Sequence, residues 1–110
     1  MKGENNYTDL TAEKFEETIN AQGKALVEFK AQWSGICHMV NPIIRGIAKI
    51  YQGSLSIYGF DTDTNVEIAN KYGVKKLPTI IFFEKGKPVD TIVGAHSRME
   101  IINRIETLYN

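Results

Sequence analysis

Apolar residues along the chain fall into short runs that alternate with polar turns. Runs rich in β-branched and aromatic residues occupy positions 25–29, 55–60 and 79–83, and another at 89–93 follows a Glu-Lys-Gly-Lys turn. The run at 25–29 is almost continuous, which is typical of a strand buried on both faces of a sheet. The last two runs, joined by the short turn, predict a β-hairpin.

Helical spacing of apolar residues predicts four helices, which lie before, between and after these strands. Thr11 is positioned to cap the first helix, Pro42 lies inside the second and is expected to kink it, and Gly73 ends the third. Ser97 and Glu100 have the spacing of a capping box at the start of the fourth. The expected helices cover residues 11–20, 36–50, 66–72 and 97–108. Together these elements predict an α/β domain with a mixed sheet and helices on both of its faces.

The length and charge of the chain suit one small globular domain. It has 110 residues, of which 43% are hydrophobic, and its 13 basic and 13 acidic side chains give a formal net charge of zero. We therefore expect a single domain over residues 1–110. A nucleic-acid partner is not expected, because a basic excess is absent. Zero net charge permits a dimer without indicating one, so the oligomeric state stays open.

The start of the chain is polar and lacks the apolar stretch of about 7–15 residues that marks a secretory signal. No run approaches the roughly 18 apolar residues of a membrane span. We expect a cytoplasmic protein without a membrane partner, although a mature chain whose signal had been removed would look the same. The one cysteine, Cys37, excludes a disulfide framework within the chain and a zinc site of several cysteines.

The segment around Cys37 holds the most reactive chemistry. It reads Trp33-Ser34-Gly35-Ile36-Cys37 and lies between the buried strand and the helix with Pro42. The thioredoxin family has Trp-Cys-Gly-Pro-Cys at this place, and the chain resembles that family over nearly its whole length. Further segments that resemble family motifs are Val27-Glu28-Phe29, Pro42, Leu77-Pro78-Thr79 with its cis-proline, and Val93-Gly94-Ala95. The resemblance implies a thioredoxin fold, with a central mixed sheet of four to five strands flanked by four helices.

The sequence also departs from the family pattern. Ser34 stands at the position of the nucleophilic cysteine, Ile36 replaces the proline between the cysteines, and Glu28 replaces a buried aspartate. Tyr58 is expected where the family often has a lysine near that acid. This weakens the expectation of an intact proton relay.

Ser34 decides the chemistry that the resemblance implies. In the family, the first cysteine attacks a substrate disulfide as a thiolate, and the second resolves the mixed disulfide. A serine oxygen cannot form that mixed disulfide, so dithiol–disulfide exchange is excluded. Cys37 is then either an inert buried thiol or a single functional thiol, which could form a mixed disulfide with glutathione or a partner protein. The helix start favours an anion at Cys37, whereas apolar burial disfavours the thiolate.

The resemblance also implies a peptide-binding groove that could survive the loss of catalysis. Its expected residues are Trp33, Gly35, Ile36, Leu77, Pro78, Thr79 and Gly94. Trp33 could equally be a packing residue that covers the helix end. The leading hypothesis is a protein of cell redox homeostasis that binds protein partners or peptides in the groove beside Pro78.

Two other interpretations of the function remain open. One is an active protein-disulfide oxidoreductase in which Ser34 is an engineered replacement, although the departure at Ile36 favours natural divergence. The other is a non-catalytic structural or interaction subunit.

The sequence leaves the roles of Glu28 and of the two histidines undecided. Glu28 could accept the proton of Cys37, as the resemblance implies, or could be a structural acid paired with Lys30 or Lys49. His38 could lie near Cys37 or be solvated. A metal site of Cys37, His38 and His96 is disfavoured, and no cofactor or metal is expected.

Overall fold

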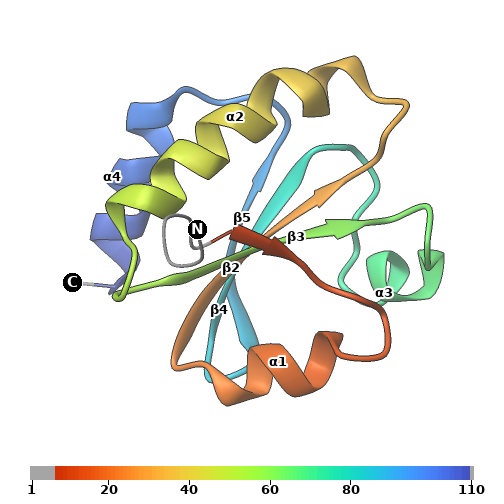
Figure 1. Ribbon diagram of the computed structural model, residues 1–110, viewed down its shortest axis with the longest axis horizontal. Helices are drawn as coiled ribbons and strands as arrows, with labels where there is room; N and C mark the ends of the chain where they lie inside the picture. Colours follow the sequence, from red (N-terminus) through yellow and green to blue (C-terminus); the bar gives the residue numbers. More distant parts are fainter. Residues whose placement is uncertain (1–6, 110) are drawn as a thin grey trace.

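The structure is a computed structural model that describes residues 7–109, so the expectations for the polar start lie outside the described residues. A five-stranded sheet has the order β1-β3-β2-β4-β5 (Figure 1). The strands are β1 (Tyr7–Asp9), β2 (Lys24–Lys30), β3 (Ser56–Asp61), β4 (Thr79–Glu84) and β5 (Lys87–Val93). β1 and β2 pair with β3 in parallel, whereas β4 is antiparallel to both β2 and β5. The sheet is therefore mixed, as expected.

Four helices cover the two faces of this sheet. They are α1 (Phe15–Ala21), α2 (Gly35–Ile50), α3 (Val66–Lys71) and α4 (Arg98–Tyr109). In Figure 1, α2 and α4 lie together on one side of the sheet, and α1 and α3 lie on the other. α2 runs without interruption through Pro42. No helix of the described residues is long and apolar enough to cross a membrane.

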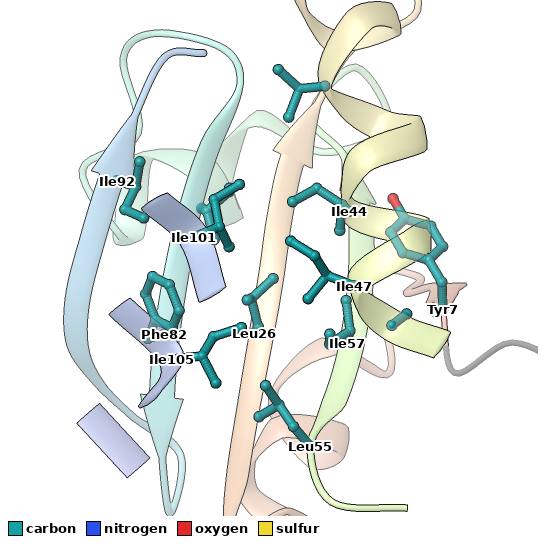
Figure 2. Close-up of a cluster of buried hydrophobic side chains, with 13 residues drawn as sticks. Tyr7, Leu26, Ile44, Ile47, Leu55, Ile57, Phe82, Ile92, Ile101 and Ile105 are labelled. Carbon is teal, nitrogen blue, oxygen red and sulfur yellow. The ribbon is translucent and has the colours of Figure 1, made fainter. Parts of the chain in front are cut away.

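β2 is the central strand, and the pleat of this strand divides the core into two layers. Leu26 faces α2 and α4, where isoleucines from both helices meet the sheet (Figure 2). Val27 and Phe29 face α1 and α3, where tilted and edge-on aromatic rings fill the space around Phe15. All four of these side chains are 0% exposed. The nearly continuous apolar run at 25–29 reflects burial on both sides.

The capping box at the start of α4 is confirmed. The amide of Glu100 donates to Ser97 Oγ at 3.1 Å, and the amide of Ser97 donates to Glu100 Oε1 at 2.8 Å. These reciprocal bonds satisfy amides that a helix start leaves without partners.

Two expectations at the start of the chain were wrong. β1 was not predicted, because three residues are too few for a recognisable alternation. The first helix begins at Phe15, and its N-cap is Lys14. Thr11 lies one turn earlier, where its Oγ1 accepts the Lys14 amide at 3.2 Å.

β1 packs closely on β3 because Gly59 has no side chain. A Cβ built on Gly59 would overlap the Tyr7 hydroxyl, and it would lie 2.5 Å from Asp9 Oδ1. Gly59 therefore leaves the space that the Tyr7 phenol occupies. This fixes the phenol against the inner part of the sheet.

We predict that Gly59→Ala lowers the free energy of unfolding by about 1–3 kcal/mol, because the new methyl group displaces Tyr7. Chemical denaturation followed by Trp33 fluorescence measures this loss. Gly23→Ala is the matched control: nothing lies within 4 Å of its Cβ, and its effect should stay within about 0.5 kcal/mol. Equal effects at the two glycines would contradict the close packing of Tyr7.

Candidate functional site

The register of the sheet gathers the candidate residues at one end of the molecule. Phe29 of β2 lies beside Thr79 of β4, and Thr79 lies beside Val93 of β5. The loop that follows β2, the segment that precedes β4 and the loop that follows β5 therefore share one edge of the sheet. Figure 1 shows the start of α2 at this same edge.

Ser34 is the N-cap of α2. Its backbone is extended, with φ −91° and ψ 114°, and its Oγ accepts the Cys37 amide at 3.2 Å. The side chain is buried, with 7% exposed. Serine is among the preferred N-cap residues because its oxygen satisfies an amide that the helix cannot. Position 34 thus holds a hydroxyl that starts the helix.

Cys37 lies in the first turn of α2 and is a free thiol with 3% of its surface exposed. It contributes to the wall of a cavity of about 260 Å³ between the start of α2 and the β1 side of the sheet. The cavity is lined by Asp9, Lys30, Ala31, Gln32, Cys37, His38, Asn41, Arg45 and Asp61. Cys37 is thus nearly closed to bulk solvent but lies against a polar cavity.

Three candidate residues beside Cys37 and Ser34 reach the surface. The side chain of Trp33 is 71% exposed, and its indole Nε1 donates to Asp63 Oδ1 at 3.2 Å. Ile36 is 48% exposed, which is unusual for an isoleucine in a helix. Gly35 between them has open space where a Cβ would stand. An apolar surface therefore surrounds the start of α2.

The segment before β4 has the expected backbone. The Leu77–Pro78 peptide bond is cis, the Gly94 amide donates to the Pro78 carbonyl at 2.8 Å, and Thr79 Oγ1 donates to the Lys76 carbonyl at 2.5 Å. Gly94 has a φ of 86°, a conformation that favours glycine. Within residues 7–109, neither the amide nor the carbonyl of Leu77 has a hydrogen-bond partner.

Glu28 is fully buried and belongs to a polar network that sequence reasoning missed. Its Oε1 accepts the Tyr7 hydroxyl at 2.9 Å and Asn41 Nδ2 at 2.9 Å, and Asn41 Nδ2 also donates to the Tyr7 hydroxyl oxygen at 3.0 Å. Asn41 Oδ1 in turn accepts Arg45 Nε at 2.9 Å. Glu28 Oε2 is buried and has no partner in the described chain. Tyr7 and Asn41 therefore donate hydrogen bonds to one oxygen of Glu28, whereas the other oxygen has no partner among the described residues.

The expected lysine partners of Glu28 were wrong. Lys30 instead pairs with Asp9 of β1, at 2.8 Å, and Lys49 is exposed near the other end of α2. Lys30 still acts on Glu28 through its charge, but makes no hydrogen bond to it.

The expected place of Tyr58 was also wrong. The residue beside Glu28 on β3 is Gly59, whereas Tyr58 pairs with Val27 and packs in the aromatic layer on the other face. The neighbour of the acid on β3 is therefore a glycine, and the Tyr7 phenol fills the space beside it.

Burial raises the pKa of Glu28 above its ordinary value of 4.5. The hydrogen bonds from Asn41 and Tyr7, and the charges of Lys30 and Arg45, lower this pKa but do not cancel the effect of burial. Burial and the nearby Glu28 carboxylate raise the pKa of Tyr7 in turn. The pair therefore favours its protonated forms.

We predict that Glu28 makes the free energy of unfolding depend on pH, and that Glu28→Gln removes this contribution. Above pH 4.5 the unfolded chain releases a proton that folded Glu28 retains, so the free energy of unfolding falls as pH rises towards the raised pKa. Glutamine does not titrate. The free energy of unfolding of the variant should therefore rise relative to that of the parent over this pH range, by at most about 1.4 kcal/mol per pH unit. Urea denaturation at a series of pH values measures the difference. Exposed Glu13→Gln is the control, and a Glu28→Gln curve parallel to the parent's would contradict the raised pKa.

The two histidines make separate local contacts. His38 Nε2 lies 2.6 Å from the Gln32 carbonyl, and His96 Nδ1 lies 3.6 Å from Glu100 Oε1. Among residues 7–109, no three metal-ligating side chains gather into a possible site. The grouping of Cys37, His38 and His96 is therefore not present.

Comparison with known proteins agrees with this geometry. The family model described as Thioredoxin matches residues 6–107. A thioredoxin of Griffithsia pacifica is 40% identical over 91 residues, which cover 83% of this chain and 84% of that protein. Thioredoxin 1 of a Nostoc strain is 34% identical over 99 residues, covering 90% and 91%. The structure of a mutant thioredoxin from Halobacterium salinarum has a TM-score of 0.82 at 26% identity, covering 94% and 89%. The fold, the order of motifs and these matches together show that the chain belongs to the thioredoxin family.

Proposed function

We propose that this thioredoxin-family protein acts in cell redox homeostasis by binding segments of partner proteins, without dithiol–disulfide exchange. The observation that carries the proposal is the side chain at position 34. Ser34 Oγ caps α2 at the place where exchange needs a sulfur, and Cys37 is the one cysteine in the chain. A complete exchange cycle alternates a pair of sulfurs between the dithiol and the disulfide, which carries two electrons, and a single sulfur cannot do this alone.

The surface around Ser34 supports peptide binding. Trp33, Ile36 and Val93 are large apolar side chains with 71%, 48% and 51% of their surface exposed. The amide and carbonyl of Leu77, which have no hydrogen-bond partner among residues 7–109, offer main-chain hydrogen bonds to an added strand. Added strands gain affinity from main-chain bonds and specificity from side-chain pockets. We propose that an extended peptide occupies the groove formed by Trp33, Gly35, Ile36, Leu77, Pro78, Thr79 and Gly94.

Single-thiol chemistry at Cys37 is part of the proposal. The Cys37 thiolate would attack glutathione disulfide, which forms a Cys37–glutathione disulfide and releases one glutathione thiolate. An external thiol would then regenerate Cys37. The cavity of about 260 Å³ against Cys37 supports access for a small molecule. Glu28 would accept the Cys37 proton only in its ionised form, which burial disfavours, and its hydrogen bonds to Tyr7 and Asn41 hold it on the β1 side.

We further propose the cytoplasm as the location, because a free thiol persists in reducing compartments. The relatives include proteins named as chloroplastic, so an organelle is the competing location.

An active oxidoreductase is the second candidate, since the matched relatives are named thioredoxins. In that case Ser34 would be a replacement of a natural cysteine. The structural-subunit interpretation has no observation of its own in its favour.

We predict that the chain does not accelerate reduction of insulin disulfides by dithiothreitol, whereas Ser34→Cys does. The substitution restores the missing sulfur three residues before Cys37 in a scaffold of the family. Ser34→Ala is the control, because it removes the cap without adding a sulfur. Turnover by the unchanged chain would overturn the proposed function.

We also predict that oxidised glutathione modifies Cys37 in the folded protein, but more slowly than in urea-unfolded protein, because only 3% of Cys37 is exposed. Intact-mass spectrometry over time measures both rates. If the adduct appears only after unfolding, the thiol is inert and single-thiol chemistry should be dropped.

A further inference from the structure

Two lysines stand directly before the groove residue Leu77. Lys75 and Lys76 are both exposed, and neither has an ion-pair partner among residues 7–109. Lys71, the nearest lysine in the preceding helix, is different because it contacts Glu16. The Leu77 side of the groove therefore carries two positive charges that the described chain does not neutralise.

Two acidic groups near Trp33 lie at the end of β3 and in the loop that follows it, and Thr62 between them lines the same cavity as Lys75 and Leu77. Asp63 Oδ1 accepts the indole N–H of Trp33, and Asp61 Oδ1 accepts the Asp63 amide at 2.9 Å. These carboxylates are held beside Trp33 by hydrogen bonds. A peptide in the groove would thus meet negative charge near Trp33 and positive charge near Leu77.

A small cavity with a mixed apolar and polar lining lies beside Leu77. It has a volume of about 170 Å³ and is lined by Thr62, Val66, Ala69, Asn70, Val74, Lys75 and Leu77. An apolar side chain of a bound peptide would enter it against Val66, Val74 and Leu77, with Lys75 in the same lining. The next peptide residue would then lie within reach of Lys75 and Lys76, whose flexible stems let the charge follow a partner.

We propose that the groove selects extended peptides with an acidic residue next to the apolar residue that pairs with Leu77. This rests on the proposed function, since it needs the groove to bind peptides. An exposed ion pair changes affinity by about 1.4- to fivefold, so two pairs give a preference of about two- to 25-fold. Salt screens exposed charges, so the preference should shrink as ionic strength rises.

Trp33 is the reporter for the test. It is the one tryptophan of the chain and borders the groove. The probes are three blocked peptides with the same Val-Ser-Val centre, flanked by Glu, Gln or Lys. None contains cysteine, so no disulfide can form with Cys37. Trp33 fluorescence titrations at low and high salt, with calorimetry as a second readout, give the three dissociation constants.

Reversing the charges of Lys75 and Lys76 tests whether these two lysines cause the preference. Lys75→Glu/Lys76→Glu should invert the order, so that the Lys-flanked peptide binds best. Lys49→Glu/Lys87→Glu is the matched control, because it changes the net charge equally at exposed positions distant from the groove. The control should keep the parent's order.

Each remaining outcome has one meaning. If all three peptides bind equally, the charge preference is wrong while peptide binding stands. If the preference persists in Lys75→Glu/Lys76→Glu, its assignment to these lysines is wrong. If no peptide binds by either readout, the peptide-binding part of the proposed function fails, and this inference fails with it.

Discussion

The start of α2 depends on one hydrogen bond, from the Cys37 amide to Ser34 Oγ. The first amides of a helix have no partner within it, and at this start a hydroxyl satisfies one of them. Sulfur is a weaker acceptor than oxygen, so a cysteine at position 34 would cap the helix less well while offering a nucleophile. At position 34 the serine therefore contributes a cap to the start of α2.

The sheet around this helix start brings the residues of the proposed groove together. The pairing of Phe29 with Thr79, and of Thr79 with Val93, brings the Ser34 loop, the Leu77–Pro78 segment and Gly94 to one edge. The polar network around Glu28, which lies beneath α2, is formed by other contacts. Glu28 is held by Tyr7 and Asn41, which draw it towards β1. The proposed groove and the buried acid thus lie on the same scaffold but depend on separate contacts.

Sequence periodicity predicted the long elements, because strands and helices of this length bury enough apolar surface to leave a clear pattern. It missed β1, and this one omission explains the wrong partner of Glu28: the strand supplies both Tyr7, which bonds the acid, and Asp9, which takes Lys30. Placing Tyr58 beside the acid was an error of one residue, which in a strand moves a side chain to the opposite face. Asn41 was missed because its contacts join residues 13 and 34 positions apart, and no local pattern marks them.

We propose that the side chain at position 34, and not the scaffold, removes dithiol chemistry. The most direct test is to equilibrate folded Ser34→Cys with a glutathione redox buffer and count free thiols by alkylation and intact mass. We predict that the introduced sulfur and Cys37 form one intramolecular disulfide that dithiothreitol reverses, with the fold retained. If the two thiols stay reduced, or carry separate glutathione adducts, the geometry around α2 has diverged as well and the claim is wrong.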